Sequence, residues 1–190
     1  MDVIPEFEAR AGYPYEVLPD GVHATDEPGF RRRLVDSIRP SQTRPTVCDG
    51  FLALRAEAVA KGICATQWVD GSFVESKADP GDLDLVTFID FEAFNALPQT
   101  ARDFAGLVLA GEESTKLMYR CHTFGVLSCD ASHGYFGTFE RARQYWRKWF
   151  GRAFDSAHPG GASQPMHLKG FVSLALGDVA QAPVISAARS

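Results

Sequence analysis

Long apolar runs are missing from this 190-residue sequence, and so is a basic and apolar N-terminal segment. A membrane-spanning helix needs about 20 consecutive apolar residues, and a signal peptide needs a basic region followed by an apolar one. The first residues, Met1 to Glu6, carry acids and no base. We therefore expect a cytoplasmic protein without a membrane partner.

Cysteines with the spacing of a zinc or redox site are also absent. The four cysteines, Cys48, Cys64, Cys121 and Cys129, form no Cys-x-x-Cys pair. In a reducing compartment we interpret them as small buried hydrophobes. A metal site from Cys121, His122 and Cys129 is an alternative, but its spacing fits no recognised zinc pattern.

The sequence also lacks an excess of positive charge. The formal net charge is −5, which argues against a protein that coats nucleic acid but leaves room for a local basic groove. The length is that of a single domain with a sizeable core. We predict one domain over residues 1–190, with an irregular, proline-containing arm over 1–28 and a tail over 178–190.

The most informative stretch of the chain lies between residues 68 and 89. An apolar run ends at Gly71-Ser72, a short polar spacer follows, and Asp82-Leu83-Asp84 then opens a second apolar run. Both runs predict β-strands, over 63–69 and 82–89. Successive side chains of a strand point to opposite faces, so Asp82 and Asp84 are expected on one face.

Two carboxylates side by side repel each other and raise each other's pKa unless a cation lies between them. Magnesium is commonly held by one or two carboxylates together with substrate phosphates. Gly71 lets the backbone come close to a ligand. Ser72 adds a hydroxyl at what we interpret as a helix N-terminus, where phosphate is favoured.

Gly71-Ser72, followed after a short spacer by Asp82-Leu83-Asp84, resembles the signature of the DNA polymerase β superfamily of nucleotidyltransferases, particularly its small single-domain prokaryotic members. The longer match, residues 68–86 with Lys169-Gly170-Phe171, is similar to an uncharacterised bacterial branch of that superfamily. The motif core covers about a tenth of the chain. The alternative is a hairpin-like connection with a solvated acidic strand start.

The resemblance implies a magnesium-dependent enzyme that moves a nucleoside monophosphate from a nucleoside triphosphate to an acceptor hydroxyl. Asp82 and Asp84 would hold two Mg²⁺ ions, with Mn²⁺ as an alternative, and Gly71 and Ser72 would bind the β- and γ-phosphates. A third carboxylate on a neighbouring strand would complete the catalytic and metal site. We assign it to Asp130 by its place at the end of an apolar run, although an acid there is also a common turn former.

The acceptor implied by the resemblance is an unknown protein or RNA, and small superfamily members often belong to toxin–antitoxin or phage-defence modules. A second hypothesis is a catalytically weak or inactive protein of the same fold that binds a toxin-like partner or regulates it. The paired acids favour activity, because a scaffold has no use for them. The absence of an additional substrate domain favours the partner model.

The remaining pattern predicts an α+β (mixed α/β) fold, a nucleotidyltransferase core with one central mixed sheet flanked by helices. The expected helices are 27–38, 47–60, 91–97, 101–109 and 139–150, and the further strands are 123–130 and 171–176. The helix over 139–150, with Thr138 as its N-cap, is the most basic segment. Its basic residues form a solvated face or contact a triphosphate or an RNA strand.

Overall fold

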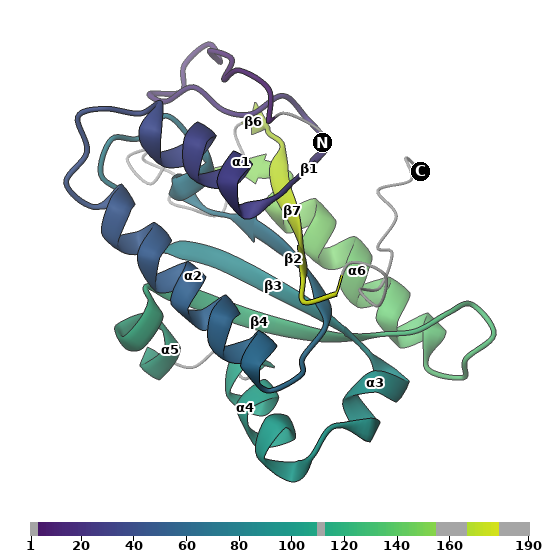
Figure 1. Ribbon diagram of the computed structural model, residues 1–190. Coiled ribbons are helices and arrows are strands. Elements are labelled where there is room, and N and C mark those ends of the chain that lie inside the picture. The colour runs from purple at the N-terminus through teal and green to yellow at the C-terminus, as the bar shows by residue number, and fades with distance from the viewer. Residues whose placement is uncertain (1–3, 110–112, 155–166, 179–190) are drawn as a thin grey trace.

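The fold is described by a computed structural model that covers residues 4–109, 113–154 and 167–178. Its centre is a mixed five-stranded sheet in the order β1-β7-β2-β3-β4 (Figure 1). The strands are β1 (Val22–Thr25), β2 (Ala65–Asp70), β3 (Leu83–Asp90), β4 (Cys121–Ser128) and β7 (Phe171–Leu176). The predicted α+β fold class is confirmed.

Strand direction changes across the sheet. β2 is antiparallel to both of its neighbours, β3 and β7, whereas β4 runs parallel to β3 and β1 runs parallel to β7. The sequence predicted β2, β3, β4 and β7 to within two residues at every end. It missed β1, because the short Val-His-Ala-Thr segment lies in the proline-containing arm, so the prediction of an irregular arm over all of 1–28 is wrong.

Helices cover both faces of the sheet (Figure 1). They are α1 (Glu27–Arg31), which continues as the π-helical segment η1 (Arg32–Asp36), α2 (Arg44–Ala60), α3 (Phe91–Ala96), α4 (Gln99–Leu109), α5 (Glu113–Tyr119) and α6 (Phe136–Phe150). The short elements are the 3-10 turn η2 (Ser72–Val74) and the two-residue strands β5 (Arg152–Ala153) and β6 (His167–Leu168). No helix within these described ranges has the length and hydropathy to span a membrane.

Two apolar layers follow from the alternation of side chains along the strands. Leu83 and Leu85 of β3 pack with the residues of α1 and α2 on one face. Val86 and Phe88 pack with Phe139 of α6 on the other. The alternation predicted from Leu83 onward is therefore confirmed, and it places Asp84 on the face that α6 covers. Asp82 lies before the first residue of β3, so the register of the sheet does not place it on that face.

One helix was not predicted, and one predicted cap is wrong. Residues 113–119 form α5, which is not among the expected helices. α6 begins at Phe136 and its N-cap residue, Tyr135, makes no side-chain capping bond, so Thr138 lies inside the helix. Most of the predicted tail over 178–190 lies outside the described residues.

Candidate functional site

Two acids face each other where β2 ends and β3 begins. Asp70 is the last residue of β2, and in the antiparallel register it pairs with Asp84 of β3. Side chains of such directly paired residues lie on the same face, with Cβ atoms about 5 Å apart. Asp84 therefore has a carboxylate neighbour on the adjacent strand, in addition to Asp82, which lies just before its own strand.

A buried lysine compensates the inner part of this charge. The Nζ atom of Lys169 lies 2.6 Å from Oε1 of Glu75 and 3.1 Å from Oδ1 of Asp70, and it also donates to the carbonyl oxygen of Gly71 at 3.2 Å. The side chains of Lys169, Asp70 and Glu75 are only 2, 7 and 5 % exposed. We call these three residues the inner cluster.

The electrostatics of the inner cluster follow from its burial. Burial raises the pKa of Asp70 to about 7, with Lys169 opposing that shift and Asp84 adding to it. Burial alone would lower the pKa of the Lys169 ammonium, but the charges of Asp70 and Glu75 outweigh it and the pKa is raised. Tyr13 of the N-terminal arm adds a hydrogen bond from its hydroxyl to Oε2 of Glu75 at 2.9 Å.

Two further ion pairs lie nearer to solvent at the same sheet end. Oδ2 of Asp82 lies 2.7 Å from Nζ of Lys116 in α5, and Oδ1 of Asp84 lies 3.3 Å from Nδ1 of His122 in β4. The Asp82 and Asp84 side chains are 28 and 37 % exposed. The protein around Asp84 and then the charge of Asp82 raise the Asp84 pKa, against the opposing effect of His122. We call these pairs the outer pairs.

The glycine of the predicted Gly71-Ser72 turn is required by its geometry. Gly71 has a φ of +83°, in the region that favours glycine, and a Cβ built there would lie 2.5 Å from Oδ2 of Asp84. The turn therefore packs directly on the acid of the neighbouring strand. Ser72 begins the single 3-10 turn η2, so the predicted helix N-terminus at this position is wrong.

A buried arginine fixes the segment that follows this turn. Arg44, at the start of α2, is fully buried and donates hydrogen bonds to the backbone carbonyls of Phe73, Glu75 and Lys77, and to that of Leu34. Burial lowers its pKa to about 10, so it stays protonated at neutral pH. Residues 73–77 are thereby held to α2 while the Gly71-Ser72 turn stays at the sheet end.

The turn and both paired acids line a hollow of about 340 Å³, towards the small end of the range for ligand pockets. Acidic, basic and aromatic side chains share its wall. The lining residues include Asp70, Glu75 and Asp84, the cationic Lys77, Arg152 and Lys169, and the aromatic Tyr13, Tyr15, Trp149 and Phe154. Gly71 and Ser72 belong to the same wall, whereas Asp82 is not one of its residues and pairs with Lys116 of α5.

The structure does not bring Asp130 to this site. Because β4 runs parallel to β3, His122 is the residue beside Asp84, and Ser128 lies beside Asp90 at the other end of the strands. Six residues of strand separate the two positions by about 20 Å. Asp130 instead accepts a hydrogen bond from the backbone N–H of Ser132 at 2.7 Å, as a turn former does. Its assignment as the third carboxylate is wrong.

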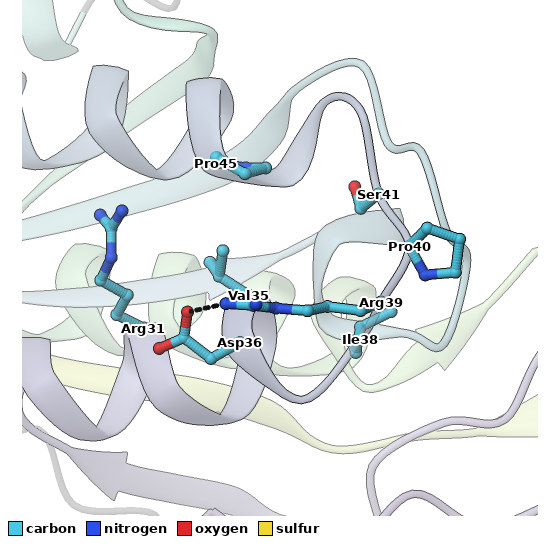
Figure 2. Close-up of a pocket in the computed structure, with 8 residues that line it drawn as sticks. All are labelled: Arg31, Val35, Asp36, Ile38, Arg39, Pro40, Ser41 and Pro45. Carbon is cyan, nitrogen blue, oxygen red and sulfur yellow. Dashed lines mark hydrogen bonds and ion pairs between the residues drawn. The ribbon is translucent and has the colours of Figure 1, made fainter.

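A larger hollow of about 530 Å³ lies elsewhere, between η1 and the start of α2 (Figure 2). Its two arginines are already paired: Arg39 with Asp36 at 3.2 Å, the dashed line in Figure 2, and Arg31 with Asp49 at 2.7 Å. Apolar and proline side chains form much of the remaining wall. None of the predicted site residues lines it, so the smaller hollow is the candidate site.

The carboxylate oxygens at this end of the sheet are donors of the kind that magnesium prefers. Within the described ranges no group of three or more His, Cys, Asp or Glu side chains is arranged to hold a metal ion. Asp82 and Asp84 are hard oxygen donors held by partners that exchange with solvent, and magnesium needs only one or two carboxylates when phosphates supply further ligands. Two carboxylates would therefore hold an ion only together with ligands from a bound molecule.

Sequence reasoning assigned no role to Asp70, Glu75 or Lys169. A signal was present for two of them. Asp70 lies two residues after Trp68 and Lys169 lies two residues before Phe171, and both aromatics belong to the layer under α6, so alternation extends that face to both charges. Glu75 lies in an irregular segment, for which no such pattern exists.

Comparison with known proteins adds a family but no activity. No curated protein and no solved structure matches the chain. One family model matches residues 11–174, a range that includes every residue of the inner cluster and of the outer pairs. The chain thus belongs to DUF6932, a family of unknown function.

Proposed function

We propose that the protein is a magnesium-dependent nucleotidyltransferase that moves a nucleoside monophosphate from a nucleoside triphosphate to an acceptor hydroxyl. The observation that carries the proposal is the shared wall of the smaller hollow, where the Gly71-Ser72 turn packs against Asp84 and Asp84 faces Asp70. A glycine turn, which has no side chain to block close approach, beside two acids suits the phosphate tail of a nucleotide and its counterion.

The reaction would need little covalent chemistry from the protein. The acceptor oxygen forms a bond to the α-phosphorus, the bond from that phosphorus to the oxygen bridging to the β-phosphate breaks, and pyrophosphate leaves with the electron pair. Magnesium would neutralise the charge that develops on the phosphate oxygens. Asp84 and Asp82 are the ligands for it, and Asp70, with its pKa of about 7, is suited to take the hydroxyl proton.

The other charges of the hollow would orient the nucleotide. Lys77 and Arg152 line the wall and would bind phosphate oxygens, while Lys169 keeps the buried acids in place through its two ion pairs. Tyr15 and Trp149 offer aromatic faces for a base. Catalysis would then come from positioning and charge neutralisation.

The test is transfer of label from each of the four α-³²P-labelled triphosphates, with Mg²⁺, to protein and to RNA. We expect Asp84→Asn to lower the rate by about a hundredfold or more. Asp130→Asn is the matched control: it makes the same chemical change at the far end of the sheet and should leave the rate unchanged. Equal loss in both variants, or transfer that persists in Asp84→Asn, would contradict the proposal.

A second candidate is a binding protein of the same architecture with little turnover, acting on a partner protein. One observation favours it: each of Asp70, Asp82 and Asp84 already has a lysine or histidine partner. In that case the outer pairs need no metal ion. Triphosphate binding that is indifferent to Mg²⁺ and to Asp84→Asn, without transfer to any acceptor, would favour this candidate over the enzyme.

A further inference from the structure

Three cations lie beside the candidate site, two in the last turn of α6 and one in β5 directly after it. Arg147, Lys148 and Arg152 line a third hollow of about 440 Å³, in which Asp20 is the one acid among the lining residues. None of the three cations forms an ion pair with a carboxylate in the part of the chain that the structure describes. We call these three residues the basic corner.

Aromatic side chains lie along the same helix. Tyr145 and Trp149 are 56 and 48 % exposed, which is unusual for residues of this size. Their rings are nearly parallel, with an interplanar angle of 12° and centroids 6.3 Å apart. Phe154 continues the row at 5.1 Å from Trp149. We call these three residues the aromatic strip.

The basic corner and the aromatic strip both lead into the candidate site. Arg152 lines the third hollow and also the hollow that holds Asp84, and Trp149 and Phe154 line the latter as well. One continuous surface therefore runs from the exposed rings and the basic corner to the paired acids. A chain lying on it would deliver its end to the place where we propose the transfer occurs.

We propose that this surface of α6 binds a single strand of nucleic acid, with bases stacked on the aromatic strip, phosphates at the basic corner and the terminal hydroxyl in the candidate site. The role of that hydroxyl as acceptor rests on the proposed function, whereas the binding does not. Proteins that bind single-stranded nucleic acid without regard to sequence use exposed aromatic faces next to a positively charged groove. A duplex does not offer its bases for such stacking.

A simpler explanation exists for part of the pattern. Cations in the last turn of a helix stabilise it by interacting with its dipole, which would account for Arg147 and Lys148 without a ligand. It does not account for two large exposed aromatic rings on the same helix, nor for a cation that lines two hollows at once. Binding measurements separate the two explanations, because a dipole effect changes stability alone.

The binding test uses a fluorescein-labelled single-stranded RNA of about 10 nucleotides, in EDTA and without triphosphate, read by fluorescence anisotropy. We expect Lys148→Gln/Arg152→Gln to weaken binding about tenfold. The slope of log affinity against log salt should become shallower by about 0.7 for each phosphate that the variant no longer neutralises. Tyr145→Ala should weaken binding by about tenfold with little change of that slope.

The matched control is Arg32→Gln/Arg39→Gln, which removes the same charge. Arg32 is exposed on η1 and Arg39 is exposed just after it, on the face of the sheet opposite α6. This variant should bind as the wild type does. Equal weakening by control and test variants, tighter binding of a duplex, or displacement of the RNA by polyglutamate of equal charge would overturn the proposal.

A transfer arm keeps the two proposals distinct. With Mg²⁺ and labelled triphosphate, label should join an RNA that ends in a 3′-hydroxyl and should not join the same RNA with a 3′-deoxy end. Binding that behaves as expected, without transfer to any acceptor, would refute the enzyme and leave the binding surface in place. Transfer to protein without RNA binding would refute the surface and leave the enzyme in place.

Discussion

Two groups of charges lie at the same end of the sheet, and they differ in what holds them. In the inner cluster, Lys169 and its two acids are at most 7 % exposed, and they bond to one another, to the Gly71 carbonyl and to the Tyr13 hydroxyl. In the outer pairs, Asp82 and Asp84 are about a third exposed and each contacts one side chain at the surface.

Because of this difference, the two groups have different roles in the candidate site. A buried ion pair is costly to break, because the remaining charge has no water to solvate it. An exposed pair contributes little and exchanges readily with ions from solvent. The inner cluster is therefore the fixed part of the candidate site, and the outer pairs are the part that the proposed metal ion would displace.

The largest expected effect comes from removing the shared cation of the inner cluster. Lys169→Met leaves Asp70 and Glu75 buried without their ammonium, so the free energy of unfolding should fall by about 3–5 kcal/mol. Urea denaturation measures it, at a pH above the Asp70 pKa of about 7. Lys116→Met is the control in an outer pair and should cost at most about 1 kcal/mol. Equal losses would remove the distinction between the two groups.

The next largest effect is expected in the pH dependence of stability, through Asp70 of the inner cluster. The pKa of Asp70 rises from 3.8 to about 7 on folding, so the folded chain binds more protons between these values. The stability that Asp70 contributes is complete below about pH 4 and is lost as the pH rises through 7. Asp70→Asn cannot titrate, so relative to the wild type it should gain stability over that range, by at most about 4 kcal/mol.

Urea denaturation in EDTA at a series of pH values measures this gain. Asp103→Asn is the control, an exposed carboxylate on α4, and its difference from the wild type should change less over the same range. A difference between Asp70→Asn and the wild type that is flat from pH 4 to 8 would mean that Lys169 keeps Asp70 fully ionised.

A smaller effect is expected where the two groups meet, at Gly71. Its carbonyl accepts from Lys169 and its Cα packs on Asp84. Gly71→Ala places a Cβ 2.5 Å from Oδ2 of Asp84 at a φ of +83°, which should cost about 1–3 kcal/mol of stability. Gly81→Ala is the control, because a Cβ there meets no atom within 4 Å. Equal melting temperatures for both variants would show that the turn adapts freely.

The face of each strand could be predicted from the sequence, but the way the strands are paired could not. Alternation along residues 82–89 correctly separated Leu83 and Leu85 from Val86 and Phe88. The register that sets Asp70 against Asp84 depends on a long irregular connection. A two-residue turn would have fixed that register, whereas a connection of this length does not.

The position of Asp130 far from the site could have been predicted from the sequence. The predicted helices over 91–97 and 101–109 lie between two adjacent strands, and a helical crossover is the usual connection between parallel strands. Parallel strands start at the same end of a sheet, so an acid after β4 had to lie far from an acid that opens β3. The residue that opens β4 beside Asp84 is His122, a position that follows from the same reasoning.

The smallest expected effect tests whether the outer pairs are exchangeable. Nζ of Lys116 lies 2.7 Å from Oδ2 of Asp82, where a divalent cation would compete with it. Lys116→Met should therefore raise the affinity for Mn²⁺, titrated calorimetrically with a non-hydrolysable triphosphate, by up to about fivefold, the equivalent of about 1 kcal/mol. Lys61→Met, which removes a lysine paired with Glu57 on α2, should leave that affinity unchanged. A lower Mn²⁺ affinity in Lys116→Met would mean that the lysine holds Asp82 in its binding orientation, and the outer pairs would then be as fixed as the inner cluster.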